Sequence, residues 1–325
     1  MCQPMLARLR ELRPDAVIDL LAPKWVLPLA ARMPEVSEAI ESPFGHGELR
    51  LGDRWRLGRT LARKGYAQAI VLPNTLKSAL VPFFAGIPLR AGYVGESRYG
   101  LINLAHKLDK AAPPPMVERY LALAGKPGDL LPEPPQTRLR VSGENLARVL
   151  AQLCLQPPSD AHPVAVLCPG AEFGPAKRWP AEYYAELAMK LRAAGFTVWL
   201  MGSQADQSVA QAILEASPGC AIDLTGRTDL ASAIDLIGVA HVVVSNDSGL
   251  MHIAAALDRP LVALFGSSSP KYTPPRTGKA RVQYLAIQCS PCFERVCPLG
   301  HFRCMRELGP SRVFGEALAA AGRTG

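Results

Sequence analysis

The sequence contains no long apolar run. No stretch approaches the roughly 18 consecutive apolar residues that a membrane-spanning helix needs. Its start, MCQPMLARLRELRPD, lacks the cationic and then apolar layout of a secretory signal peptide. The chain also has no internal repeat of fixed period and no low-complexity tract. These absences argue against a membrane-spanning, secreted or repeat protein, and they predict cytoplasmic residence.

Several motifs of nucleotide and hydrolase chemistry are missing too. The chain has no G-x-G-x-x-G of dinucleotide-binding folds and no glycine-rich loop that ends in G-K-[ST]. A hydrolase that uses Ser248 and His252 would be expected to carry a G-x-S-x-G elbow, which is also absent. No strip of interleaved aromatic and basic residues indicates nucleic-acid binding. These absences disfavour a nicotinamide-dependent enzyme, a P-loop ATPase, a serine hydrolase and a nucleic-acid partner.

The composition is that of a folded globular protein. Of the 325 residues, 49% are hydrophobic and 20% are charged, which allows a sizeable core. This length exceeds one typical domain, so two α/β domains are the natural expectation. The formal net charge of +8 suits an anionic membrane face or an acidic substrate, although solubility alone also explains it.

Strand and helix patterns alternate along the chain, which predicts parallel, doubly wound sheets. Residues 125–135 are rich in proline and glycine and approach a domain boundary, and a second break follows at 157–160. We therefore expect a first domain over residues 1–157 and a second over residues 158–325. The last helix could pack back on the first domain.

The most informative stretch is HVVVSNDSGLMHIAAALDRPLVALFGSSSP, residues 241–270. A short β-branched strand leads into a polar loop, then a helix, then a second strand. Such a loop binds anions because free N–H groups and the helix dipole point into it. Asp247, Ser248, Gly249 and His252 lie at this point, so the pattern favours a diphosphate site.

Each of these four residues also has a purely structural explanation. Asp247 or Ser248 could cap the helix, His252 could face the core, and Gly249 could relieve crowded packing. For one residue alone the structural explanation would be preferred. Four together at the carboxyl end of a parallel strand favour a ligand site.

A second basic loop opens the second domain. Residues 164–180, VAVLCPGAEFGPAKRWP, predict a strand and a glycine-bearing loop, with Pro180 suited to the first turn of the next helix. Lys177 and Arg178 precede that helix, where positive charge would suit a leaving diphosphate. The alternative is a solvated pair, which the adjacent Trp179 makes less attractive.

The first domain carries a weaker candidate site. Asn74 and Lys77 lie where a strand passes into a helix, and residues 90–93 and 95–99 predict a glycine-punctuated loop that carries Arg90 and Arg98. These side chains could receive an anionic acceptor, or the charged ones could form a solvated face. The sequence leaves the two alternatives equal.

Four of the eight cysteines are clustered near the C-terminus. Cys289, Cys292, Cys297 and Cys304 have the spacing C-x2-C-x4-C-x6-C, with His301 among them. This spacing could hold zinc through four cysteines, or through three cysteines and the histidine. A loop of reduced thiols is an equal alternative, and disulfides are disfavoured in a reducing cytoplasm.

Four segments together closely resemble the inverting ADP-heptose glycosyltransferases of family 9, over nearly the whole chain. They are VLPNTLKSALVPFFAGIP, YVGESRYGL, CPGAEFGPAKRWP and NDSGLMHIAAALDRPLVALFG. The D-[ST]-G-x-x-H pattern is shared across the family. GAEFGPAKRWP is typical of members that act on the first heptose of the lipopolysaccharide inner core.

The resemblance implies a GT-B architecture, in which two Rossmann-like domains face a cleft and the second holds the donor. The implied donor-binding residues are Lys177, Asp247, Ser248, Gly249 and His252. Lys177 and His252 would assist catalysis, and no metal or other cofactor would be required for it. Zinc at the cysteine cluster would be structural.

The resemblance also implies a reaction. Heptose would pass with inversion from ADP-L-glycero-D-manno-heptose to heptosyl-Kdo2-lipid A. The acceptor is held at the inner face of the cytoplasmic membrane, where a basic protein suits its anionic groups. Peripheral membrane contact is therefore expected.

The first residues differ from the family pattern. Family members start with a strand and a Gly–Asp loop, and the resemblance aligns residues 1–6 with the end of that segment. Residues 6–13 also predict a helix, whereas an α/β domain normally starts with a strand. The Asp is the family's proposed general base, and no residue here aligns with it. We therefore expect poor folding, slow or no transfer, and activity restored by extending the reading frame upstream. The alternative is a pseudo-enzyme that binds nucleotide sugar or lipopolysaccharide.

Overall fold

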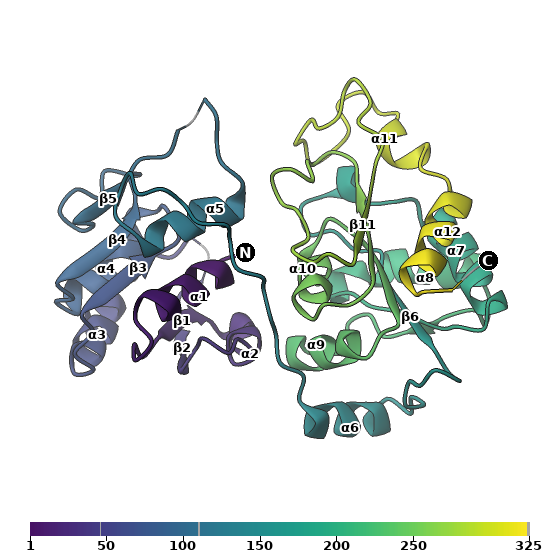
Figure 1. Cartoon of the computed structure of the whole chain (residues 1–325), viewed down its shortest axis with the longest axis horizontal. Helices are drawn as coiled ribbons and strands as arrows, with labels where there is room; N and C mark the ends of the chain where they lie inside the picture. The colour runs from purple at the N-terminus through teal and green to yellow at the C-terminus, as the bar shows by residue number, and fades with distance from the viewer. Residues whose placement is uncertain (46, 110, 324–325) are drawn as a thin grey trace. The chain divides into compact units, whose positions relative to one another are not determined.

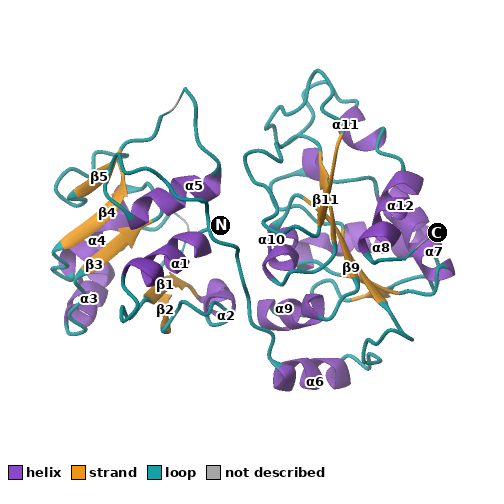
Figure 2. Ribbon diagram, viewed as in Figure 1, coloured by secondary structure: helices purple, strands orange, loops and turns teal. Residues whose placement is uncertain are grey.

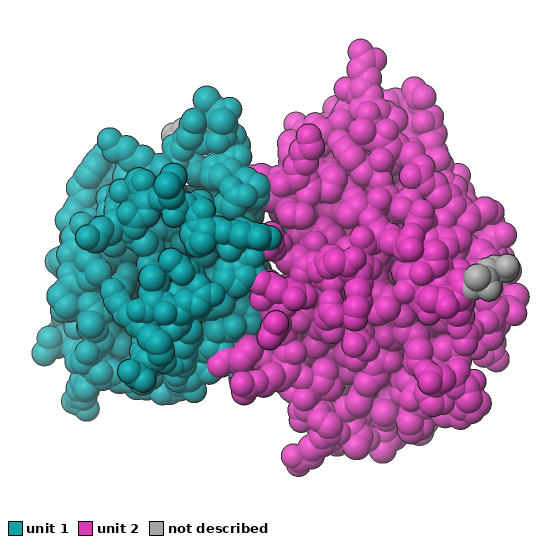
Figure 3. Space-filling view, in the orientation of Figure 1, with its two compact units in different colours: residues 1–31, 35–135 teal, residues 32–34, 136–325 magenta. Residues whose placement is uncertain are grey.

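The computed structural model describes residues 1–45, 47–109 and 111–323 (Figure 1). The chain forms two compact units, one of residues 1–31 and 35–135 and the other of residues 32–34 and 136–325 (Figure 3). This boundary lies earlier than the expected one between residues 157 and 158. The reason is that α6 (Gly143–Gln152) packs against α9 (Leu230–Gly238) of the second unit.

The first unit contains two parallel sheets, which fits the expected α/β class. One pairs β1 (Asp19–Pro23) with β2 (Glu38–Ser42). The other has the order β3 (Gln68–Val71), β4 (Leu89–Tyr93) and β5 (Leu104–His106). The α-helices of this unit are α1 (Gln3–Leu12), α2 (Leu27–Ala30), α3 (Leu51–Ala62), α4 (Leu76–Phe84) and α5 (Met116–Leu121).

Strand β4 corrects one expectation, because the sequence predicts a glycine-punctuated loop at residues 90–93. Gly92 creates that impression, yet it lies inside the strand and pairs with Val71. A Cβ at Gly92 would lie 3.2 Å from the Val71 carbonyl oxygen and 3.3 Å from Ile102 Cδ1. The glycine therefore permits close approach of the backbone rather than a turn.

The second unit is built on one six-stranded parallel sheet with the order β11–β10–β9–β6–β7–β8. Its strands are β6 (Val164–Cys168), β7 (Thr197–Leu200), β8 (Ile222–Asp223), β9 (Val242–Asn246), β10 (Leu261–Phe265) and β11 (Ala280–Tyr284). Every residue of β6, β9 and β10 is buried, as expected for central strands that are covered on both faces. The edge strand β11 was not anticipated, because its partly exposed residues carry no strong apolar pattern.

Helices cover both faces of this sheet (Figure 2). The helices α7 (Ala181–Ala193), α8 (Gln207–Ala216) and α12 (Pro310–Ala320) share one apolar core with the sheet, and α12 packs on α7. On the other face lie α9 and α10 (Gly249–Ala256), while α11 (Arg303–Arg306) is a short helix before α12. None of the described helices is both long and apolar enough to cross a lipid bilayer.

Candidate functional site

The candidate site lies where three central strands of the second unit end. Strands β10, β9 and β6 are neighbours, so the loops at their carboxyl ends meet at one edge of the sheet. In open α/β sheets this edge is where ligands bind. The strand order therefore brings the loop after β6, which carries Lys177, to the loop after β9, which carries Asp247.

Lys177 and Asp247 form an ion pair at this edge. Lys177 Nζ lies 2.5 Å from Asp247 Oδ2, and their side chains are 17% and 4% exposed. The Ser268 hydroxyl donates to the same carboxylate oxygen at 2.6 Å, and the Thr273 hydroxyl lies 3.5 Å from Oδ1. An ammonium group has three N–H donors, so this pairing leaves others for a ligand anion.

Asn246, the last residue of β9, fixes the loop after β6. Its side-chain oxygen accepts from the Trp179 backbone N–H at 3.2 Å and from the Tyr184 hydroxyl at 3.2 Å. Its amide nitrogen donates to the Pro169 carbonyl at 2.8 Å. Asn246 is fully buried, so these bonds join the two loops without solvent competition. The position of Lys177 therefore follows from the strand pairing.

Lys177 is supported by aromatic packing as well. It ends the short 3-10 turn Pro175–Lys177, and its Nζ lies 5.1 Å from the centre of the Phe173 ring. This distance is within the range of a cation–π interaction. Trp179, two residues on, is 1% exposed and donates from Nε1 to the Leu308 carbonyl at 2.8 Å.

The start of α10 has no side-chain cap. Ser248 occupies the N-cap position, but its hydroxyl lies 3.1 Å from the Ser245 hydroxyl and does not accept from the helix. A Cβ at Gly249 would meet no heavy atom within 4 Å, so this glycine relieves no crowding. The first N–H groups of the helix therefore keep the arrangement that suits a bound anion.

His252 lies one turn into α10 and is half-buried. Burial lowers its pKa, and the charge of Lys177 acts in the same direction while that of Asp247 opposes it. The imidazole ring is therefore neutral at physiological pH. No hydrogen bond joins Ser248 to His252 among the described residues, so the pair lacks the geometry of a nucleophile and its base.

The four polar candidates in the first unit have different environments. Arg98 is 3% exposed and donates to the carbonyls of Pro73 and Tyr93, and to the Asn74 side-chain oxygen at 3.3 Å. Arg90 donates to the carbonyls of three neighbouring residues, Ile87, Gly100 and Leu101. Both guanidinium groups thus cross-link the backbone, a role that the sequence did not suggest.

Lys77 differs from the two arginines. It is half-buried at the start of α4, and its ammonium group forms no hydrogen bond or ion pair with other described residues. Among these four candidates it is therefore the one whose charge is available to a ligand.

Several site residues were not found by sequence reasoning. Ser268, Thr273, Asn246 and Phe173 all contact Lys177, Asp247 or their loops. Ser268 belongs to the Ser-rich run that directly follows β10, and this was the available signal. The sequence does not reveal that β10 and β9 are neighbours in the sheet, and it is this pairing that brings the run to Asp247.

Comparison with known proteins identifies the family. Residues 54–303 match the model of glycosyltransferase family 9 (heptosyltransferase). The chain is 47% identical to lipopolysaccharide heptosyltransferase 2 of Salmonella typhimurium, over 97% of this chain and 93% of the relative. It is also 47% identical to lipooligosaccharide heptosyltransferase 2 of Haemophilus influenzae, over 87% and 84% respectively.

A solved structure gives the same result in three dimensions. The structure of E. coli ADP-heptose LPS heptosyltransferase II superposes with a TM-score of 0.85 at 44% identity, covering 98% of this chain and 94% of that one. The fold is therefore the GT-B fold of this family. Sequence match, fold and the site at the head of α10 lead to one conclusion: the chain belongs to glycosyltransferase family 9, the heptosyltransferases.

Proposed function

We propose that this chain transfers L-glycero-D-manno-heptose from ADP-heptose to the first heptose of the lipopolysaccharide inner core. The observation that carries the proposal is Lys177 Nζ, held 2.5 Å from Asp247 at the uncapped start of α10. The names of relatives that are 47% identical over most of the chain support the choice of donor and acceptor. They favour a transferase over a protein that only binds the sugar nucleotide.

The donor diphosphate binds between Lys177 and the first turn of α10. As the bond to the anomeric carbon breaks, negative charge grows on the departing ADP. Lys177 supplies a full positive charge, and the N–H groups at Ser248 and Gly249 supply oriented dipoles. The acceptor hydroxyl oxygen attacks the anomeric carbon from the opposite face as the bond to the diphosphate breaks, which inverts the configuration, and the hydroxyl proton is released to solvent.

The acceptor is heptosyl-Kdo2-lipid A, an anionic lipid at a membrane surface. The first unit carries Lys77 without a protein partner among the described residues, and this ammonium group would contact the acceptor's acidic groups. The formal net charge of +8 favours peripheral contact with an anionic membrane face.

A transfer assay tests the proposal. Purified protein is incubated with ADP-heptose and heptosyl-Kdo2-lipid A, and the product is expected to gain one heptose by mass spectrometry. Kdo2-lipid A without heptose is the matched control and should not be extended. Release of free heptose without transfer would indicate a hydrolase instead. Binding of ADP-heptose without turnover would indicate a binding protein.

His252 gives a separate prediction. Replacing His252 with alanine should lower turnover more strongly than it lowers the unfolding midpoint, because the ring is one turn into α10, the helix whose start forms the donor site. Equal losses of turnover and stability would instead assign His252 to the core.

The pH dependence of stability provides a further check on His252. Burial favours the neutral ring in the folded chain, so its folded pKa lies below the unfolded value of about 6.5. The unfolded chain then binds the proton more readily, and stability falls as the pH drops below that value. His252→Gln cannot titrate and should show a smaller acid loss in urea unfolding measured from pH 7 to pH 5.

A further inference from the structure

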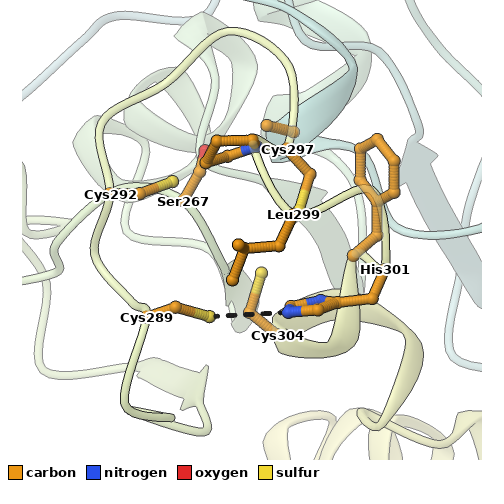
Figure 4. Close-up of a pocket in the computed structure, with 10 residues that line it drawn as sticks. Ser267, Cys289, Cys292, Cys297, Leu299, His301 and Cys304 are labelled. Atoms are coloured by element: carbon orange, nitrogen blue, oxygen red, sulfur yellow. Dashed lines mark hydrogen bonds between the residues drawn. The ribbon is translucent and has the colours of Figure 1, made fainter.

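Three cysteines from one loop and a fourth from the start of α11 line a single small pocket in the second unit (Figure 4). They are Cys289, Cys292, Cys297 and Cys304, the four that the sequence groups. The sulfur atoms of Cys289, Cys292 and Cys304 point into this pocket (Figure 4). The donor chemistry described above uses none of these side chains.

His301 lies beside this cluster, and its ring is oriented to donate a hydrogen bond rather than to bind a metal. Its Nδ1 accepts a hydrogen bond from the Arg303 backbone N–H at 3.0 Å, so the proton of the neutral ring is on Nε2. Nε2 faces the Cys289 sulfur at 3.9 Å. A protonated nitrogen has no lone pair for a metal, whereas an N–H that donates to sulfur stabilises a thiolate. This arrangement favours four sulfur ligands over three sulfurs and a histidine.

One further group points to negative charge in the pocket. Cys297 opens a tight turn, in which Gly300 has a φ of +68° and donates to the Cys297 carbonyl at 3.1 Å, so the backbone fixes the place of this cysteine. The Ser267 side chain also lines the pocket and is 1% exposed. Its hydroxyl has no hydrogen-bond partner among the described residues. Buried hydroxyls rarely stay unpaired, and a thiolate would accept this one.

The loop that carries the cluster has little other support. Between Tyr284, where β11 ends, and Arg303, where α11 begins, the described residues form no helix or strand. Three of its large apolar side chains are more than half exposed, namely Phe293, Val296 and Leu299. A connection of this length that has no apolar core of its own needs another stabilising cross-link, and a bound metal would supply one.

We propose that Cys289, Cys292, Cys297 and Cys304 bind one Zn²⁺ as a tetrahedral tetrathiolate, with His301 hydrogen-bonded to Cys289 outside the ligand set. No three histidine, cysteine or acidic side chains stand close enough to share an ion in the described part of the chain. Binding would therefore require the cysteine side chains to turn inward to Zn–S distances of about 2.3 Å, and it would release the thiol protons.

The zinc would also stiffen the donor site, if the proposed function holds, because the cysteine loop is bonded to the loop that carries Lys177. The Arg295 carbonyl accepts from the Ala176 N–H at 3.1 Å, and Arg295 Nε donates to the Phe173 carbonyl at 2.7 Å. The Phe293 N–H donates to the Ser267 carbonyl at 2.7 Å, next to Ser268.

Metal analysis tests the inference without reference to activity. Protein purified with a reductant and without chelators is expected to hold about one zinc per chain. Cys297→Ser and Cys304→Ser should lose it, whereas Cys154→Ser, a thiol elsewhere in the chain, should keep it. His301→Gln should keep it as well, because the ring is not a ligand. Cobalt substitution should give the charge-transfer bands of a four-sulfur site.

Thiol alkylation of the unaltered protein keeps the test independent of whether variants fold. The four cluster cysteines should resist alkylation with zinc bound and react after chelation, while exposed Cys154 reacts in both states. Absence of zinc, a disulfide among the four, or equal alkylation with and without chelator would overturn the proposal. Loss of zinc in His301→Gln with retention in one cysteine variant would replace the tetrathiolate by a site of three cysteines and one histidine.

Discussion

Replacing Lys177 with methionine is expected to weaken ADP binding at least about tenfold and to lower heptose transfer further. Methionine keeps an unbranched side chain over the Phe173 ring but removes the charge. A charge-assisted hydrogen bond contributes roughly 1.5–3 kcal/mol, which corresponds to about a tenfold to hundredfold change in affinity. The effect on transfer is larger because charge on the diphosphate grows in the transition state.

Calorimetric titration with ADP and a transfer assay at saturating donor measure the two effects separately. Lys190→Met is the matched control, because Lys190 lies on α7 in an ion pair with Glu186 away from the site. The substitution at Lys177 also leaves the buried Asp247 carboxylate without its cation, so folding must be verified by thermal unfolding first. Unchanged ADP affinity in a folded Lys177→Met protein would refute the assignment of the donor site.

Replacing Trp179 with alanine should give the largest loss of stability of any substitution proposed here, about 3–5 kcal/mol. The indole is 1% exposed and forms edge-to-face contacts with Tyr183 and Tyr184, at centroid distances of 5.6 and 4.9 Å. Alanine leaves a cavity and removes the hydrogen bond that the Leu308 carbonyl accepts. The expected fall in the unfolding midpoint is about 6 °C or more.

Two variants make this measurement specific. Trp179→Phe should lose less, because the ring still fills most of the space and only the hydrogen bond is lost. Trp25→Ala, at a side chain that is 73% exposed, should change stability by no more than about 0.5 kcal/mol. Since Trp179 also fixes the loop that holds Lys177, the alanine variant should bind ADP weakly even below its unfolding temperature. A loss below about 1 kcal/mol would show that the loop is held by other contacts.

The parts of the site that were predicted from the sequence are those encoded by neighbouring residues. The strand, polar loop and helix around Asp247 follow from a local pattern, and the structure places the strand end and helix start within a residue or two of the expected positions. Lys177 was identified in the same way, as a cation just before a helix. Neither inference required knowledge of what lies across the fold.

The roles of several charged residues depended on distant contacts. Arg98 and Arg90 were candidates for binding an anionic acceptor, but they donate to backbone carbonyls of their own unit. Nothing in a single sequence distinguishes a guanidinium group that binds a ligand from one that satisfies carbonyls. Burial decides this, and burial is a property of the folded chain.

What the sequence by itself determined was the alternation of strands and helices, the anion-binding loop before α10 and the spacing of the four cysteines. Only the tertiary structure decided that Lys177 meets Asp247, that Ser268 and Thr273 join them, and that His301 faces the cysteine cluster as a donor. The physical reason is that periodicity and capping act over a few residues, whereas these contacts depend on strand order. Because β6 and β10 both pair with β9, residues 70 and 21 positions from Asp247 reach the same carboxylate.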